Sequence, residues 1–231
     1  MIKIILWDID GTILNFLAAE KAAIRRCFEI FGLGKCTDEM ISEYSSINVK
    51  YWEKLERGEL TKPEILVGRF REFFRHYNID TSVAEAFNSE YQIRLGDTIC
   101  FFDGATEVLE HYKGRLLQCA VTNGTRVAQE RKLKESGLDR VFDYIFISED
   151  VGFEKPNQKY FEKVTETLRP CRKDEIIIIG DSLTSDIKGG REFGIRTCWF
   201  NPAGKNGGPG LYDFEIQSLS QVTEIIGKFN S

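Results

Sequence analysis

The spacing of apolar residues changes twice along the chain and divides it into three parts. Residues 2–7 are mostly apolar and rich in β-branched side chains, which is typical of a strand buried on both faces of a sheet. Residues 16–95 carry apolar side chains at helical spacing, without a strand signal. From Phe101 onward, short apolar runs alternate with helical patterns, as in parallel βα units. The pattern therefore predicts an α/β protein with a helical insertion.

The insertion is expected to contain four amphipathic helices. We place them at residues 16–31, 37–57, 61–77 and 81–93. Four such helices can bury their apolar faces against one another, so residues 16–96 are expected to form a helical bundle domain. Linkers near Leu14 and Gly96 would connect this domain to the rest of the chain. Two linkers form a hinge, which suits a lid over a binding crevice.

The second half of the chain is expected to complete the sheet that the first strand begins. Strands are predicted at residues 116–121, 144–147, 175–179 and 197–200, and helices at 104–112, 126–136, 158–168, 183–193 and 218–228. Residues 1–15 and 97–231 together are therefore expected to form a Rossmann-like, doubly wound parallel sheet domain. The Gly-rich segment 203–210 lacks the G-K-[ST] ending of a P-loop and is interpreted as a surface loop.

Composition and charge narrow the classes of partner. The chain has 231 residues, of which 42% are hydrophobic and 29% charged, as in an ordinary globular protein. Its net charge is −5 and it has no basic run, so a nucleic-acid polymer is not expected as a partner. No apolar run approaches membrane-spanning length, and the six scattered cysteines suit reduced thiols. We expect a cytoplasmic protein without a membrane partner, either a monomer or a homodimer.

Two aspartates follow the first strand at the position where parallel sheets bind ligands. Asp8 and Asp10 lie in the stretch Asp8-Ile9-Asp10-Gly11-Thr12. Two carboxylates that lie close together repel each other unless a cation separates them. Oxygen-only ligands favour Mg²⁺, which we therefore expect as the cofactor.

Three more polar clusters follow later strands or precede later helices. Thr122 and Asn123 provide a hydroxyl and an amide ahead of a predicted helix N-terminus, a place that binds anions. Lys155 provides a positive charge directly before a proline, and Asp181 and Asp186 add two carboxylates after the strand at 175–179. Phosphoryl-transfer sites use side chains of these kinds.

Together the four clusters resemble the motifs of the haloacid dehalogenase-like superfamily of phosphotransferases. The motifs are Asp8-Ile9-Asp10-Gly11-Thr12, Thr122-Asn123-Gly124, Lys155-Pro156, and Gly180-Asp181 through Asp186. Their order and spacing agree along essentially the whole chain, and the helical block is similar to the superfamily's α-helical cap. The runs 121–124, 152–156 and 180–190 resemble its nucleoside 5′-monophosphatase branch, which acts on pyrimidine nucleotides, including noncanonical ones.

The resemblance implies a Mg²⁺-dependent phosphomonoester hydrolase that acts through an aspartyl phosphate. Asp8 would be the nucleophile, and Asp10 the general acid and base. Dehalogenases of the superfamily lack this second acid and its ATPases carry threonine there, so Asp10 favours phosphatase or phosphomutase chemistry. The implied substrate is a small phosphate monoester, a nucleotide in the branch that the motifs resemble.

The resemblance also implies which residues bind the metal and the phosphoryl group. Mg²⁺ would be held by the Asp8 carboxylate, the Asp10 backbone carbonyl and Asp181, with Asp186 farther out or reaching it through water. The phosphoryl oxygens would be held by Thr122, the Asn123 backbone N–H and Lys155.

Several alternatives remain open from the sequence. The same chemistry could act on phosphoglycolate or a sugar phosphate, or the protein could be a phosphomutase. A non-catalytic binding protein would be expected to have lost Asp8 or Asp10, and both are present. In the helical insertion, Asn48, Tyr51 and Trp52 form a polar and aromatic cluster that could stack on a base if it faces the crevice.

Overall fold

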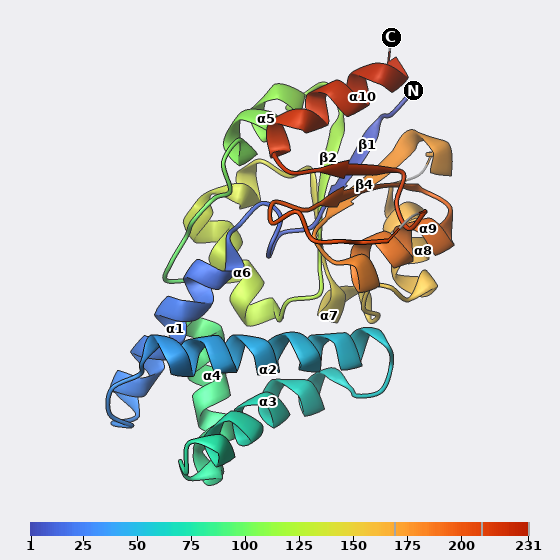
Figure 1. Cartoon of the computed structure of the whole chain (residues 1–231). Helices are drawn as coiled ribbons and strands as arrows, with labels where there is room; N and C mark the ends of the chain where they lie inside the picture. The colour runs from blue at the N-terminus through green and yellow to red at the C-terminus, as the bar shows by residue number, and fades with distance from the viewer. Residues whose placement is uncertain (169, 209, 231) are drawn as a thin grey trace.

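A six-stranded parallel sheet lies above a unit of four helices in the computed structural model, which describes residues 1–168, 170–208 and 210–230 (Figure 1). The strands are β1 (Ile4–Trp7), β2 (Leu117–Thr122), β3 (Tyr144–Ile147), β4 (Ile176–Gly180), β5 (Arg196–Phe200) and β6 (Phe214–Ile216). Their order in the sheet is β3-β2-β1-β4-β5-β6, and all neighbouring pairs are parallel. The order reverses at β1, so a ligand crevice is expected beyond the carboxyl end of this strand.

Helices cover both faces of the sheet. They are α5 (Ala105–Tyr112), α6 (Arg126–Ser136), α7 (Ser148–Val151), α8 (Gln158–Thr167), α9 (Lys188–Phe193) and α10 (Val222–Asn230). Ile5 and Trp7 of β1 pack on the face covered by α5, α6 and α10. Ile4 and Leu6 pack on the opposite face, against α8 and α9. Because both faces of the sheet are buried, the central strands β1 and β4 carry no polar side chain.

The four helices of the insertion form their own apolar core. They are α1 (Phe16–Ile30), α2 (Asp38–Glu56), α3 (Lys62–His76) and α4 (Ala84–Arg94). The rings of Phe28, Tyr44, Phe70, Phe73 and Phe87 pack against one another inside this unit. Its helices begin where the sequence supplies caps. The Thr37 hydroxyl accepts from Met40 N–H at 3.2 Å, and Glu64 accepts from Thr61 N–H at 2.8 Å.

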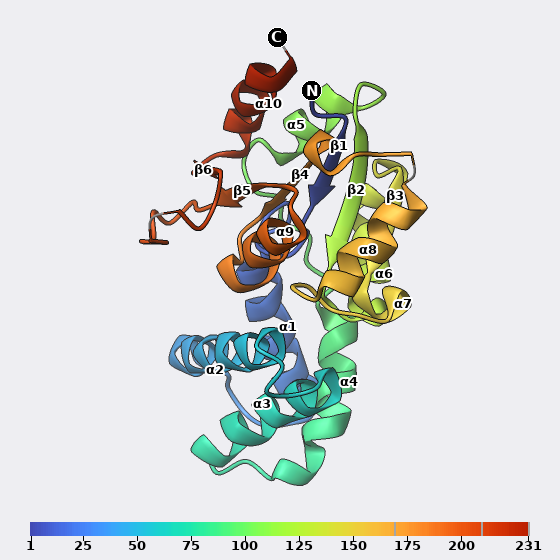
Figure 2. The same cartoon turned by 90° about the vertical axis from the view of Figure 1, so that its right-hand side faces the viewer.

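Two linkers join the helical unit to the sheet, and they run side by side. Asn15 N–H donates to Cys100 O at 2.7 Å, and Phe102 N–H donates to Ile13 O at 3.0 Å. The helical unit therefore meets the sheet at the end toward which β1 and β2 point (Figure 2). The chain termini lie together at the opposite end (Figure 1).

The predicted parallel α/β fold with helical segments around the sheet is confirmed, with differences in detail. The strand β6 was not predicted, because its three residues are too few to show an alternating pattern. The helix predicted at 183–193 begins as a π-helical turn over Leu183–Ile187 and becomes α-helical only at Lys188. Among the described residues, no helix is both long and apolar enough to cross a membrane, and Cys27, Cys36, Cys100, Cys119 and Cys198 are free thiols.

Candidate active site

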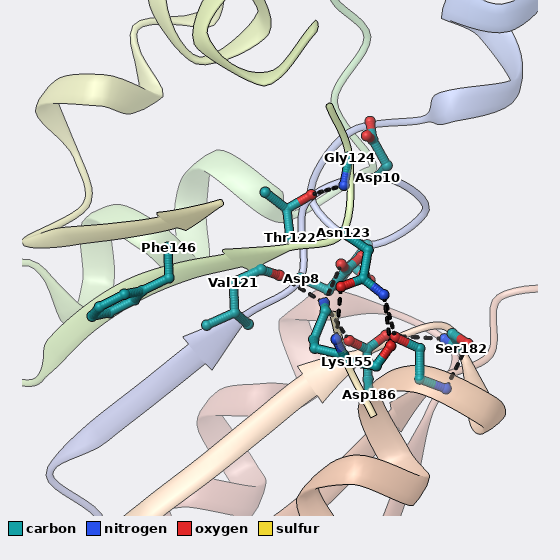
Figure 3. Close-up of polar contacts among 12 residues, drawn as sticks. Asp8, Asp10, Val121, Thr122, Asn123, Gly124, Phe146, Lys155, Ser182 and Asp186 are labelled. Carbon is teal, nitrogen blue, oxygen red and sulfur yellow. Dashed lines mark hydrogen bonds and ion pairs between the residues drawn. The ribbon is translucent and has the colours of Figure 1, made fainter. Parts of the chain in front are cut away.

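Lys155 and two carboxylates form the buried centre of the crevice beyond β1 (Figure 3). The Lys155 ammonium donates to Asp8 Oδ1 at 2.9 Å, to Asp186 Oδ1 at 2.6 Å and to Val121 O at 2.7 Å. These three bonds use all three of its hydrogens. The Lys155 and Asp186 side chains are each 1% exposed, so the charges stabilise one another away from bulk water.

Burial and neighbouring charge act in opposite directions on these groups. Burial raises the pKa of Asp8 to about 7, against the attraction of Lys155, and the charge of Asp186 adds to the rise. Burial would lower the pKa of Lys155, but the carboxylates of Asp186 and Asp8 outweigh it and the pKa is raised. Lys155 is therefore a fixed cation, whereas Asp8 needs positive charge nearby to stay ionised at neutral pH.

A third carboxylate gives the crevice more negative than positive charge. Oxygens of Asp8, Asp181 and Asp186 all lie within 4.8 Å of one another, and Asp181 remains open to solvent. The pKa of Asp181 is raised because protein surrounds it on most sides and because Asp8 and Asp186 repel its charge. One ammonium cannot neutralise three carboxylates, and these hard oxygen donors fit a Mg²⁺ ion.

The turn after β1 brings the first motif against Asp181. Gly11 has a φ of +97°, and a Cβ at this position would lie 2.4 Å from Asp181 Oδ2. Only glycine satisfies both requirements without strain. The Thr12 hydroxyl donates to Asp8 Oδ2 at 3.1 Å, so the remaining oxygen of Asp8 is also held in place.

Thr122 and Asn123 lie in the crevice, where their side chains shape the loops. Asn123 Oδ1 accepts from Lys155 N–H at 2.8 Å, and Asn123 Nδ2 donates to Lys155 O at 2.8 Å. The Asn123 side chain therefore fixes the backbone that carries the lysine. The Thr122 oxygen accepts from Gly124 N–H at 3.0 Å, which leaves its own hydrogen available as a donor (Figure 3).

The Asp10 carboxylate points away from Asp8 and is bound by helix α6. Lys132 Nζ donates to Asp10 Oδ1 at 2.5 Å, and Gln129 Nε2 donates to Asp10 Oδ2 at 2.6 Å. Neither residue was singled out from the sequence. They are spaced i, i+3 on the predicted helix 126–136 after the second motif, so the sequence did place them on one helix face.

A small cavity of about 20 Å³ lies beside Asp10 and reaches the helical unit. Trp52 lines this cavity, but the other two members of the predicted base-binding cluster lie elsewhere. Asn48 is buried and bonded to Glu20 and Arg69, whereas Tyr51 donates to Glu72 on the surface. The hypothesis of a three-residue cluster facing the crevice is therefore wrong for Asn48 and Tyr51. Helical spacing alone did not show which face of α2 lies inside the unit.

The end of α2 and the start of α3 contact the loops of the crevice. Glu56 accepts a hydrogen bond from the Thr184 hydroxyl, in the segment between Asp181 and Asp186. Lys62 Nζ donates to Ser148 Oγ at 2.6 Å and lies 3.6 Å from Glu154 Oε1, next to Lys155. Polar contacts thus join the helical unit to two sides of the crevice, at Thr184 on one side and at Ser148 and Glu154 on the other.

Comparison with known proteins gives consistent matches over this chain. Residues 5–200 match the model of the family described as haloacid dehalogenase-like hydrolase. The HAD-hydrolase YfnB of Bacillus subtilis is 35% identical over 230 residues, covering 99% of this chain and 97% of the relative. A crystal structure of YfnB bound to magnesium, which reveals interdomain movement in that protein, superposes with a TM-score of 0.91 over 97% of this chain and 98% of that chain.

Two further relatives have names that state a substrate class. The pyrimidine 5′-nucleotidase PynA of Streptococcus pneumoniae is 32% identical and covers 87% of this chain and 84% of its own length. The pyrimidine 5′-nucleotidase YjjG of Escherichia coli is 26% identical and covers 97% of both chains.

Proposed function

This chain belongs to the haloacid dehalogenase-like hydrolase family, and on that premise we propose that it is a Mg²⁺-dependent phosphatase acting on nucleoside 5′-monophosphates. The main observation that supports this proposal is the environment of the Asp8 side chain. A buried carboxylate lies against the Lys155 ammonium, within reach of two further carboxylates and at the end of the central strand. Such a site can hold a phosphoryl group between a nucleophile, a cation and a metal ion.

In the proposed reaction, Asp8 acts first. One of its oxygens bonds to phosphorus, and the bond from phosphorus to the ester oxygen breaks, which leaves an aspartyl phosphate. Asp10 gives a proton to the departing ester oxygen. Asp10 then takes a proton from the water that attacks the aspartyl phosphate, so that phosphate is released and Asp8 is restored. Both proton transfers would take place with the Asp10 carboxylate held on α6, on the side of the crevice where the leaving group would lie.

Other residues of the crevice would bind and neutralise the phosphoryl oxygens. We assign this role to Lys155, the Thr122 hydroxyl and the Asn123 backbone N–H. Asp8, the Asp10 backbone carbonyl and Asp181 would hold Mg²⁺, which when bound neutralises charge on the phosphoryl oxygens. Asp186 would hold Lys155 in place through their 2.6 Å ion pair, beside the metal.

We further propose that residues 16–96 act as a cap over a core formed by residues 1–15 and 97–231. Two observations support this division: the helical unit has its own apolar core, and it contacts the crevice loops through Glu56 and Lys62. Because these contacts are polar and the linkers lie side by side, the cap can open about one axis. An open state would admit the substrate, and a closed state would exclude water.

The nucleotide assignment is supported by the two pyrimidine 5′-nucleotidases among the relatives. The leaving group of a substrate would lie beside Asp10, where the cavity of about 20 Å³ would have to widen by opening of the cap to admit a nucleoside. Trp52 and Arg69 from the cap meet Asp10 and Lys132 there. The aromatic ring of Trp52 suits a planar heterocycle, whereas the buried Arg69 guanidinium is already bonded to Asn48 and holds the cap together.

Phosphate release from a panel of substrates tests the proposal. The panel contains pyrimidine and purine nucleoside 5′-monophosphates, sugar phosphates and phosphoglycolate, each with Mg²⁺ and with a chelator, beside the Asp8→Asn variant. We expect Mg²⁺-dependent release that is fastest with a pyrimidine nucleotide and absent in Asp8→Asn. Fastest release from another member would overturn the substrate assignment, and no release by the folded, metal-loaded protein would overturn the phosphatase.

A further inference from the structure

Both carboxylate oxygens of Asp10 are bound by side chains of α6, and we propose that Lys132 is a positioning residue that sets where this acid lies for its proton transfers. The inference rests on the proposed function, since it assigns the acid and base role to Asp10. It goes beyond that function because no family motif quoted above contains Lys132. The contacts that support it are the 2.5 Å ion pair and the 2.6 Å hydrogen bond from Gln129.

The burial of Lys132 gives the ion pair its strength. The Lys132 side chain is 2% exposed, whereas that of Asp10 is 20% exposed and reaches the crevice. Burying an ammonium costs free energy unless a carboxylate lies against it. The folded protein is therefore more stable when Asp10 stays beside Lys132. Its other close neighbour is the Phe16 ring, whose centroid lies 5.0 Å away and which holds the cation without neutralising it.

Gln129 reaches the second oxygen of Asp10 because the residue next to it is glycine. A Cβ at Gly124 would lie 2.1 Å from Gln129 Nε2, so any larger residue would displace the amide. Gln129 is fully buried, and its Oε1 has no hydrogen-bond partner in the described part of the chain. The side chain therefore forgoes one hydrogen bond in order to make the one to Asp10.

Helix α6 is itself anchored by two contacts, one to helix α4 of the helical unit and one to the second linker. Thr125, its N-cap, donates to Gln92 Oε1 of α4 at 2.7 Å, and Arg131 Nη2 lies 2.6 Å from Asp97 Oδ1 in the second linker. The helix that holds Asp10 is thus fastened to the segment about which the cap would turn. Because α6 is fixed in this way, the ion pair with Lys132 also fixes the Asp10 carboxylate.

A positioning role and a purely structural ion pair predict different kinetics. Proton donation matters for a poor leaving group such as the 5′-oxygen of a nucleoside, and matters little for p-nitrophenolate, which leaves without a proton. If Lys132 places the acid, its loss should slow the formation of the aspartyl phosphate far more from the nucleotide than from p-nitrophenyl phosphate. If it only stabilises the fold, both substrates should be affected alike.

The experiment measures kcat/KM, which reports formation of the aspartyl phosphate and not its hydrolysis, for a nucleoside 5′-monophosphate and for p-nitrophenyl phosphate in five proteins. They are the wild type, Asp10→Asn, Lys132→Met, Lys132→Arg and the control Lys134→Met. Lys134 lies on the same helix but is exposed, so its variant removes an equal charge without touching Asp10. For Lys132→Met we expect about a 100-fold loss of kcat/KM on the nucleotide and a loss of less than tenfold on p-nitrophenyl phosphate.

The other variants distinguish a failure of the inference about Lys132 from a failure of the proposed role of Asp10. Lys132→Arg, which keeps a cationic donor, should recover at least tenfold on the nucleotide, and Lys134→Met should match the wild type. Equal losses on both substrates, or no loss, in Lys132→Met would overturn the inference. If Lys132→Met does not fold, Gln129→Met takes its place with the same criterion. If Asp10→Asn itself shows no preference between leaving groups, the proposed role of Asp10 fails instead.

Discussion

At the scale of single residues, the crevice holds an imbalance of charge that only a bound cation corrects. Asp8, Asp181 and Asp186 converge on one point, and Lys155 pairs with only two of them. Burial raises the pKa of Asp8 to about 7, so without a metal ion a large fraction of this nucleophile is protonated at neutral pH. A carboxylate must be ionised to attack phosphorus. The arrangement therefore links catalysis to metal binding.

The close approach of Gly11 to Asp181 gives a prediction about metal affinity. In Gly11→Ala the new Cβ meets the Asp181 carboxylate and must displace it, and a φ of +97° strains any residue with a side chain. We expect the Mg²⁺ concentration for half-maximal activity to rise by at least tenfold, as measured by titrating Mg²⁺ in a phosphate-release assay.

A matched control for this variant is Gly114→Ala. Gly114 also has a positive φ, of +69°, but nothing lies within 4 Å of its Cβ position. It should lose stability without a change in the Mg²⁺ requirement. If the two variants have the same Mg²⁺ requirement, backbone strain and not the displacement of Asp181 explains the effect.

The sequence predicted the motif residues of the crevice better than the residues that support them. Asp8, Lys155, Asp181 and Asp186 were placed together because parallel strands end at one edge of a sheet. Lys132 and Gln129 were not, since a lysine and a glutamine on an amphipathic helix are ordinary surface residues until a tertiary contact buries them. Their positions depend on how α6 packs, which local sequence does not state.

At the scale of elements, the turn from α2 to α3 is the part of the helical unit that contacts the metal-binding loops. Glu56 lies at the end of α2 and binds Thr184 in the π-helical turn. Burial raises the pKa of Glu56 to about 7, although the hydroxyl of Thr184 opposes the rise. This carboxyl is therefore partly protonated in the folded protein near neutral pH.

The raised pKa of Glu56 predicts a pH-dependent stability. A carboxyl whose pKa is higher in the folded than in the unfolded state binds its proton more tightly when folded, so its contribution to stability falls as the pH rises from about 4.5 to about 7. In Glu56→Gln this contribution is absent. Between pH 5 and pH 8, the free energy of unfolding of the wild type should therefore fall by about 2 kcal/mol relative to that of the variant.

Urea unfolding at several pH values, with a chelator present, measures this difference. Glu53→Gln is the control, because Glu53 lies one turn earlier on α2 with a side chain that is 44% exposed. It should follow the wild-type pH dependence. Parallel curves for the wild type and Glu56→Gln would show that Glu56 titrates in the folded protein as it does in the unfolded chain.

Element boundaries followed the sequence where caps define them. The helix predicted at 126–136 has those bounds in α6, because Thr125 caps its start and Gly137 ends it with a φ of +75°. The predicted helix at 183–193 is also capped, since Ser182 Oγ accepts from Ser185 N–H at 3.1 Å, but it does not begin as an α-helix. Its first turn widens where the Ser182 N–H and the Lys155 ammonium both bond to Asp186. Tertiary contacts of the crevice thus set the local helix geometry there.

At the scale of the whole molecule, the apolar core of the helical unit meets the cores of the sheet domain through polar contacts, two linkers and Ala128 of α6, which packs into the helical unit. Each core was predictable, because the periodicity of apolar residues separates 16–95 from the βα units that follow. How the helical unit lies over the crevice was not predictable. It depends on a few contacts such as those of Lys62 with Ser148 and of Gln92 with Thr125, which have no sequence signature. The division into cap and core stays a proposal that binding experiments can test.

Metal binding should stabilise the whole chain. A ligand that binds only the folded state adds about 2.7 kcal/mol at 100 times its dissociation constant. The melting temperature of the wild type should therefore rise by several degrees when Mg²⁺ replaces a chelator, as measured by calorimetry. Asp181→Asn should lose most of this rise, and the exposed-site control Asp103→Asn should keep it. An equal rise in all three proteins would show that Mg²⁺ binds elsewhere.

The central claim is that Asp8 carries the phosphoryl group during turnover, and the most direct test is to find it there. The Asp10→Asn variant is mixed with p-nitrophenyl phosphate and Mg²⁺, quenched with acid during turnover, digested, and examined by mass spectrometry. This substrate leaves without a proton, whereas release of phosphate needs the missing base, so the intermediate should accumulate. The account predicts a phosphoryl group on the peptide that contains Asp8. Stoichiometric release of p-nitrophenol with that peptide unmodified would contradict it.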